Sequence, residues 1–269
     1  MLFRSLRQLR IENRQTPRAY FKGLNYLLNE QQDQAIDAFI EAVQHDPDTS
    51  ELHFALGNLF RRRGEYERAV RVHQHLLSRG DLSQADLDRA QHALALDFLK
   101  AGLLDRAEDA LSKLEGTAFA EQAHLALLSI YERSRDWAKA TDIAHKLNAS
   151  GHGSFQGRLA HYLCEQAEST DTPQDHASKI RLLQQAIDTA PHAARAPLAM
   201  AKVLSESGQS QAAYDTLKRL AQSAPTAVPL LAPRLSVLAQ ELNCIDDALL
   251  FLEHLYQHTA SLEIGRAHV

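Results

Sequence analysis

The chain has 269 residues, of which 45% are apolar and 23% are charged, so it can bury a substantial interior and is not disordered overall. Its 11 glycines and 8 prolines are too few for a sandwich or barrel of many short strands, and they favour helices with brief connections. A net charge of −5 gives no general attraction to nucleic acid. The two cysteines, Cys164 and Cys244, show no CxxC spacing, which excludes a disulfide framework and a thiolate zinc site and indicates a reducing compartment.

The first predicted element is a basic amphipathic segment over residues 1–15. Three leucines of this segment share one face and arginines surround them: Leu2, Leu6, Leu9, Arg4, Arg7, Arg10 and Arg14. Residues 1–14 suit contact with an anionic membrane surface or the cytoplasmic flank of a membrane anchor, and they equally suit a helix that caps the next element. No apolar run approaches the roughly 18 residues of a membrane helix. The sequence as it stands therefore predicts a soluble cytosolic chain.

Residues 16–260 repeat internally. The first copy carries the small, aromatic and proline positions of a tetratricopeptide repeat at Gly23, Tyr26, Ala35, Phe39 and Pro47. The next copy, 34 residues further on, matches this pattern at Leu56, Gly57, Phe60 and Ala69. Later copies are weaker but stay in phase, and the alanine of the second helix recurs at Ala107, Ala140, Ala213 and Ala248.

This period predicts an all-α fold, a right-handed superhelix (α-solenoid) of about seven helix-turn-helix units. Neither helix of a unit can bury its apolar face alone, so the units must stack. The small residues lie where paired helices approach closely. Gly64, Gly102 and Gly208 are predicted to end first helices in a left-handed conformation, and Pro47, Pro191 and Pro225 to end second helices. Residues 148–157 and 169–176 are predicted to be longer connections.

No pattern in the chain argues for an enzyme. The 14 histidines include no HExxH motif, and the close pair His73 and His75 points to different faces of a helix. The glycines at 151, 153 and 157 have the wrong spacing for a nucleotide-binding loop, and no strand precedes them. We expect a protein without catalytic residues, and without a metal or cofactor of its own.

A run of arginines at the end of the second repeat's first helix is the best candidate for a binding site. The first helix of each repeat lines the concave groove, and Asn58, Arg61 and Arg62 lie at or beside its groove-facing positions. A guanidinium there can bind a partner's carboxylate through two hydrogen bonds. His92 and Lys100 of the next repeat would extend this surface. The alternative is a solvated helix end that only complements the helix dipole.

Four stretches together resemble one family within the tetratricopeptide proteins, the lipopolysaccharide assembly protein B family of Gram-negative bacteria. They are Tyr20–Leu28 with Gln31–Ala35, Leu56–Glu65 with Arg68–Ala69 and His73–Gln74, Ala101–Asp109, and Ala160–Glu165. The resemblance covers residues 18–260.

The resemblance implies a non-enzymatic adaptor at the cytoplasmic face of the inner membrane. Such an adaptor helps a membrane AAA+ protease to degrade the deacetylase that commits precursor to lipid A, and it contacts other envelope assembly proteins. Two other classes remain open: a generic tetratricopeptide co-chaperone or secretion scaffold, and a regulatory subunit of an envelope enzyme complex.

The chain departs from the family pattern at both ends. The family has an N-terminal membrane helix and a C-terminal rubredoxin-like domain that holds a metal on two CxxC pairs, and this sequence contains neither. Residues 264–269 break the apolar period and resemble a translated sequencing adapter. We therefore expect a non-native tail over residues 261–269, after the repeat array of residues 16–260.

Overall fold

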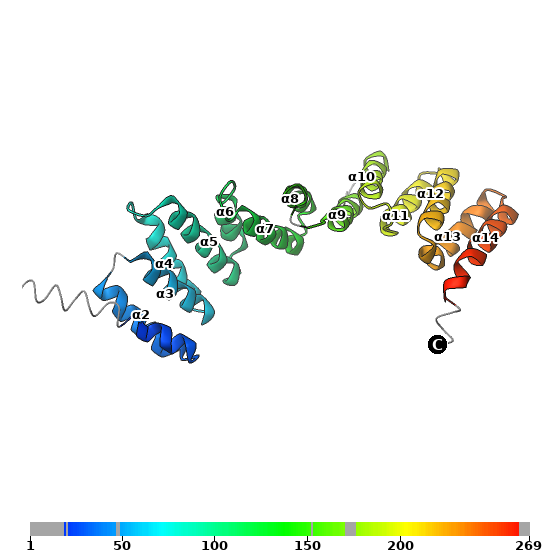
Figure 1. Cartoon of the computed structure of the whole chain (residues 1–269). Coiled ribbons are helices and arrows are strands. Elements are labelled where there is room, and N and C mark those ends of the chain that lie inside the picture. Colours follow the sequence, from blue (N-terminus) through cyan, green and yellow to red (C-terminus); the bar gives the residue numbers. More distant parts are fainter. Residues whose placement is uncertain (1–18, 20, 47–48, 152, 170–175, 264–269) are drawn as a thin grey trace, which may run out of the picture. The chain divides into compact units, whose positions relative to one another are not determined.

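The computed structural model describes residues 19–263, except for residues 20, 47–48, 152 and 170–175. Residues 21–28 form a helix, and the elements that follow are α2 (Gln32–His45), α3 (Ser50–Arg62), α4 (Tyr66–Ser78), α5 (Gln84–Lys100), α6 (Leu104–Ser112), α7 (Ala120–Ser134), α8 (Trp137–Ala149), α9 (Gln156–Ser169), α10 (His176–Thr189), α11 (Arg195–Glu206), α12 (Ser210–Ser223), the 3₁₀ turn η1 (Pro225–Ala227), α13 (Val228–Glu241) and α14 (Ile245–Glu263). The described part contains no strand (Figure 1). The all-α prediction is confirmed.

The described part of the chain divides into two compact units, with the boundary between Ile130 and Tyr131. In the first unit α2 packs on α3, α3 on α4, α4 on α5 and α5 on α6, and α3 also contacts α5. In the second unit the same pattern links α8 through α14 in order, and α9 also contacts α11. Helices therefore pack on their neighbours in the chain, and α3 with α5 and α9 with α11 also contact the matching helix of the next repeat, as expected of an α-solenoid.

The repeat positions named from the sequence form the interior. The second-helix alanines are fully buried at Ala35, Ala69, Ala107, Ala140 and Ala213, and Ala248 is 4% exposed. The glycines at 64, 102 and 208 have φ between +75° and +79°, the left-handed region that ends a helix without a Cβ clash. These helix-pairing and turn predictions are confirmed.

Pro233 lies inside α13, which begins before it after η1 and has another proline in its first turn. The basic segment of residues 1–15 and the last six residues of the chain lie outside the described residues. No helix in the described part is long and apolar enough to cross a membrane.

Candidate partner-binding site

The arginine run lies at the C-terminal end of α3, where Arg61 and Arg62 occupy the last turn. Arg63 caps this helix and Gly64 then reverses the chain. The side chain of Arg61 is only 18% exposed. Its Nη1 donates to Asp97 Oδ1 at 2.8 Å and to the carbonyl of Ala93 at 3.2 Å, and its Nη2 donates to Asn58 Oδ1 at 2.5 Å. Arg61 therefore joins α3 to α5 inside the chain.

A buried histidine completes this network from the other helix of the repeat. His73 of α4 and Asp97 of α5 both have fully buried side chains, and Nδ1 of His73 lies 2.5 Å from Asp97 Oδ2. The carboxylate of Asp97 thus has a cationic donor on one oxygen and an imidazole donor on the other, which compensates its burial. We call Asn58, Arg61, His73 and Asp97 the buried network. It connects three helices from two successive repeats.

The second nitrogen of His73 faces the backbone of α3. Nε2 of His73 is buried and has no hydrogen-bond partner within the described part of the chain. A Cβ atom added to Gly57 would lie 2.5 Å from this nitrogen. In the first repeat the equivalent glycine, Gly23, meets the ring of Phe39 in the same way, with the nearest atom 2.9 Å from an added Cβ. The imidazole therefore occupies the place of an aromatic core residue.

Asp97 was missed in the sequence analysis, although two signals pointed to it. His73 lies 34 residues after Phe39, so a polar ring stands at an apolar position of the repeat. Asp97 itself interrupts a run of alanines and leucines that ends in Phe98 and Leu99. A carboxylate in an otherwise apolar helix face needs a buried partner. The two irregularities together predict the pair.

The predicted groove surface is therefore only partly available. Arg61 already has a carboxylate, so we correct the expectation that its guanidinium is offered to a partner. Arg62 is exposed, and no carboxylate of the described residues forms an ion pair with it. Lys100 is also exposed, and His92 is half-buried with its ring stacked on Phe119 at a centroid distance of 4.8 Å. Partner binding by these residues stays a prediction, with Arg62 as its central cation.

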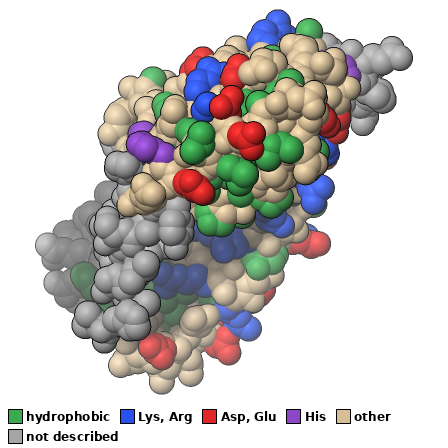
Figure 2. All heavy atoms as spheres, turned by 90° about the vertical axis from the view of Figure 1, so that its right-hand side faces the viewer, with side chains coloured by type: hydrophobic (Ala, Val, Ile, Leu, Met, Phe, Trp, Pro, Cys, Tyr) green, Lys and Arg blue, Asp and Glu red, His purple; other side chains and the backbone are tan. Residues whose placement is uncertain are grey.

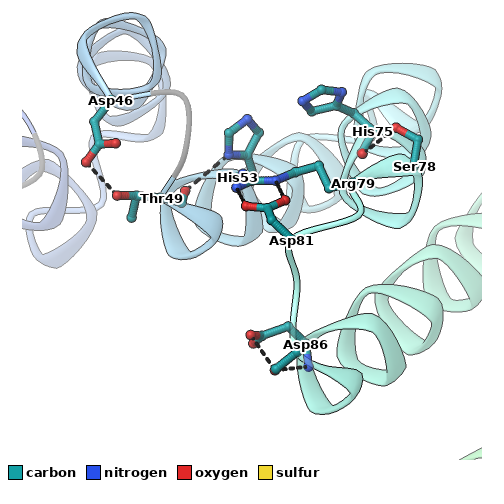
Figure 3. A network of polar contacts seen from close by, with 9 residues as sticks. Asp46, Thr49, His53, His75, Ser78, Arg79, Asp81 and Asp86 are labelled. Atoms are coloured by element: carbon teal, nitrogen blue, oxygen red, sulfur yellow. Dashed lines mark hydrogen bonds and ion pairs between the residues drawn. The ribbon is translucent and has the colours of Figure 1, made fainter.

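A second polar cluster surrounds His53 at the opposite end of the same repeat (Figure 3). The ring of His53 is buried, and its Nδ1 lies 3.2 Å from the carbonyl of Thr49, to which it can donate. His75 lies next to it, with ring centroids 5.5 Å apart. Arg79 binds Asp81 through two hydrogen bonds of 2.9 and 2.6 Å. Within the described residues no three potential metal ligands come together.

Two histidines in this unit should make its stability depend on pH. Burial lowers the pKa of His53 from 6.5, and the nearby charges of His75 and Arg79 lower it further. Burial also lowers the pKa of His92, with a smaller contribution from Arg61. Because both folded-state pKa values lie below the unfolded value, the unfolded chain binds protons first as the pH falls. Stability should therefore decrease as the pH falls below about 6.5, the ordinary pKa of histidine.

Thermal melts between pH 7.5 and 5.5 test this dependence. His53→Asn retains a donor for the Thr49 carbonyl but cannot titrate, and His92→Gln removes the second titrating ring. Each variant should melt with a weaker pH dependence than the parent chain. An exposed histidine, His145, provides the matched control through His145→Gln. Equal pH slopes in all four proteins would contradict the assignment.

Comparison with known proteins gives consistent results. A family profile described as tetratricopeptide repeat matches residues 52–87. Lipopolysaccharide assembly protein B of Escherichia coli K12 is 36% identical over 204 residues, which are 76% of this chain and 52% of that protein. The Haemophilus influenzae protein of the same name is 34% identical over 244 residues, or 87% of this chain and 61% of that protein. The chain thus spans between about half and three fifths of the length of these relatives.

Solved structures resemble the chain more loosely. A tetratricopeptide repeat protein from Parabacteroides merdae is 14% identical, with a TM-score of 0.47 over 91% of this chain and 93% of that chain. The Naa15/Naa10 complex bound to HypK-THB gives 18% identity and a TM-score of 0.48 over 93% of this chain and 46% of that chain. The resemblance predicted from the sequence is confirmed by the named relatives.

Proposed function

Taking the chain as a tetratricopeptide-repeat homologue of lipopolysaccharide assembly protein B, we propose that it is a non-enzymatic adaptor in the control of lipopolysaccharide synthesis. It presents the committed-step deacetylase of lipid A synthesis to a membrane AAA+ protease, and it works at the cytoplasmic face of the inner membrane. The observation that carries this proposal is the similarity to the named relatives over 87% of the chain, which includes the repeats of both compact units. Stacked repeats offer long surfaces for protein partners.

The proposal assigns the chain a docking role and no chemistry of its own. Arg62, Lys100 and the half-buried His92 lie on first helices of successive repeats, and they can receive an acidic segment of a partner. Arg61 supports this surface indirectly, because its bonds to Asn58 and Asp97 fix the end of α3 against α5.

A reconstituted degradation assay tests the adaptor role. The purified deacetylase and the membrane protease are incubated with ATP, with and without this chain, and the half-life of the deacetylase is measured. We expect a shorter half-life when the chain is present, and recovery of both proteins in a pull-down with the chain. An unchanged half-life together with no recovery of either protein would reject the proposal. Capture of chaperone C-termini would favour the co-chaperone class. A change in the catalytic rate of the deacetylase, without its degradation, would favour the regulatory subunit.

The contribution of the arginine run is tested at Arg62 alone. Arg61 is unsuitable because Arg61→Glu would place a second carboxylate beside the buried Asp97 and would destabilise the fold. Arg62→Glu should weaken partner binding by about 1.5–3 kcal/mol, the usual range for a hydrogen bond to a charged group. Binding should also weaken as salt rises, because the contact is exposed. The matched control is Arg71→Glu on α4, where Arg71 is 77% exposed and its only described carboxylate partner is Glu67.

A further inference from the structure

The second compact unit contains a groove between the first helices of two successive repeats. It encloses about 470 Å³ between α11 and α13. Its apolar lining comes from three helices: Ala201 of α11, Leu217 of α12, and Pro233, Val237 and Leu238 of α13. Its rim is polar and consists of Lys202, Ser205, Glu206 and Arg234. A hollow of this composition, apolar below and polar at the rim, is typical of binding sites.

The wall formed by α13 continues this apolar surface beyond the groove. Leu230 is 68% exposed and Val237 is 54% exposed, and Pro233 lies between them at the same helical spacing. These three side chains therefore form one apolar line along the solvent-facing side of α13. Exposed apolar surface of this kind marks an interaction site more often than scattered single residues do.

The rim of the groove carries a net positive charge. Arg234 is held in place because its Nη1 donates to the carbonyl of Leu198 on α11 at 3.1 Å. No carboxylate of the described residues pairs with this guanidinium. Lys202 lies 3.8 Å from Glu206, one turn further along the same helix, so these two charges largely compensate each other. One positioned and uncompensated cation thus stands beside an apolar lining.

We propose that the groove between α11 and α13 binds an amphipathic peptide segment of a client protein. Its apolar side chains occupy the groove along Val237 and Pro233, and an Asp or Glu within one helical turn of them pairs with Arg234. The proposal rests on the adaptor function above, and it adds a second docking site of different chemistry from the arginine surface of the first unit. The groove provides hydrophobic contact area, while the guanidinium selects an acidic residue.

A second exposed apolar surface, on α14, is the alternative docking site for such a peptide. Leu249 and Leu250 are 54% and 65% exposed, and Asp246 and Asp247 precede them. Figure 2 shows hydrophobic side chains among acidic ones on the face that it views. Acidic neighbours on α14 would repel the carboxylate that Arg234 attracts. The α14 surface would therefore favour basic peptides, whereas the groove beside Arg234 would favour acidic ones.

A random peptide display library tests the groove without the deacetylase as a probe. Selection on the whole chain should enrich peptides that carry Leu, Ile, Val or Phe with an Asp or Glu within four positions. Val237→Asp and Arg234→Glu should each weaken the binding of these synthetic peptides at least about tenfold, a loss of about 1.4 kcal/mol. Arg234→Lys should retain part of the affinity, because a lysine supplies the charge but cannot form the bidentate hydrogen bonds of a guanidinium.

Matched controls carry the same changes elsewhere on the second unit. Leu250→Asp places an acid on the exposed face of α14, and Arg181→Glu reverses an exposed charge on α10. Both controls should bind the peptides within twofold of the parent chain, and all variants should keep its circular-dichroism spectrum. Enrichment of peptides without acidic residues, no enrichment at all, or equal binding by the groove variants would overturn the proposal. Failure of the adaptor role would appear separately, as an unchanged half-life of the deacetylase.

Discussion

Replacing Asp97 with alanine should lower the free energy of unfolding of the first compact unit by about 3–5 kcal/mol, the usual cost of breaking a buried ion pair by removing one partner. The substitution leaves the 18% exposed guanidinium of Arg61 without its carboxylate, and it removes the partner of Nδ1 of the buried His73. Chemical denaturation followed by circular dichroism measures the loss. Asp88→Ala on the same helix is the matched control, because the one side-chain bond that Asp88 accepts from the described residues is an exposed one from Gln84.

A combined variant separates the polar network from simple packing. His73→Phe restores the aromatic residue that the first repeat has at Phe39, and Asp97→Leu with Arg61→Met removes the remaining charges. Replacing a buried ionic group by apolar residues of similar volume is often neutral or stabilising. The triple variant should therefore be more stable than Asp97→Ala alone. If Asp97→Ala lowers the free energy of unfolding no more than Asp88→Ala does, water must compensate the loss of the buried network.

The second large effect is expected at Gly57. Gly57→Leu should cost roughly 1–3 kcal/mol through overpacking, because the first added carbon would lie within contact distance of a ring that cannot move. The nearest atoms of His73 would be 2.5 and 2.6 Å from that carbon, and the ring is held by Asp97 on its other side. Gly57→Ala should already destabilise the unit measurably. The same denaturation experiment checks both variants.

Two further substitutions make the Gly57 prediction specific. Gly80→Ala should be close to neutral, since nothing lies within 4 Å of an added Cβ at that position. The double variant Gly57→Ala with His73→Ala should lose less than the sum of its single changes, because the second substitution removes the atoms that the first one meets. Additive losses would mean that the strain at Gly57 arises from the helix itself.

The sequence predicted the fold well because the repeat has geometric requirements. The buried alanines at 35, 69 and 107 and the left-handed Gly64 and Gly102 follow from close helix pairing and tight turns, which few residue types satisfy. The helical course of α13 through Pro233 was harder to predict, since a proline there is compatible with either a break or a continuing helix.

The binding surface was predicted less well, because residue type and helix face do not determine partners. Arg61 was correctly placed beside the groove, but its charge is compensated by Asp97, 36 residues later in the chain. The hydrophobic period and the composition of a helix describe that helix alone. The contact between Arg61 and Asp97 depends instead on which residue of the next repeat faces Arg61. Arg234 shows the converse case: nothing in its local sequence marks it, and only the fold brings it to the carbonyl of Leu198 on α11, where it lines a groove.

The separation between Arg61 and Asp97 also matters for the order in which the protein is made. Most contacts of the first unit join helices that follow one another, so they can form soon after each helix leaves the ribosome. The second repeat is different. Its own helices, α3 and α4, contain Arg61, His73 and the acceptor Asn58, but the carboxylate that both Arg61 and His73 contact belongs to Asp97, 36 residues after Arg61. A nascent chain that ends before α5 therefore lacks this carboxylate, and we expect the second repeat to gain its full stability only after α5 has been synthesised.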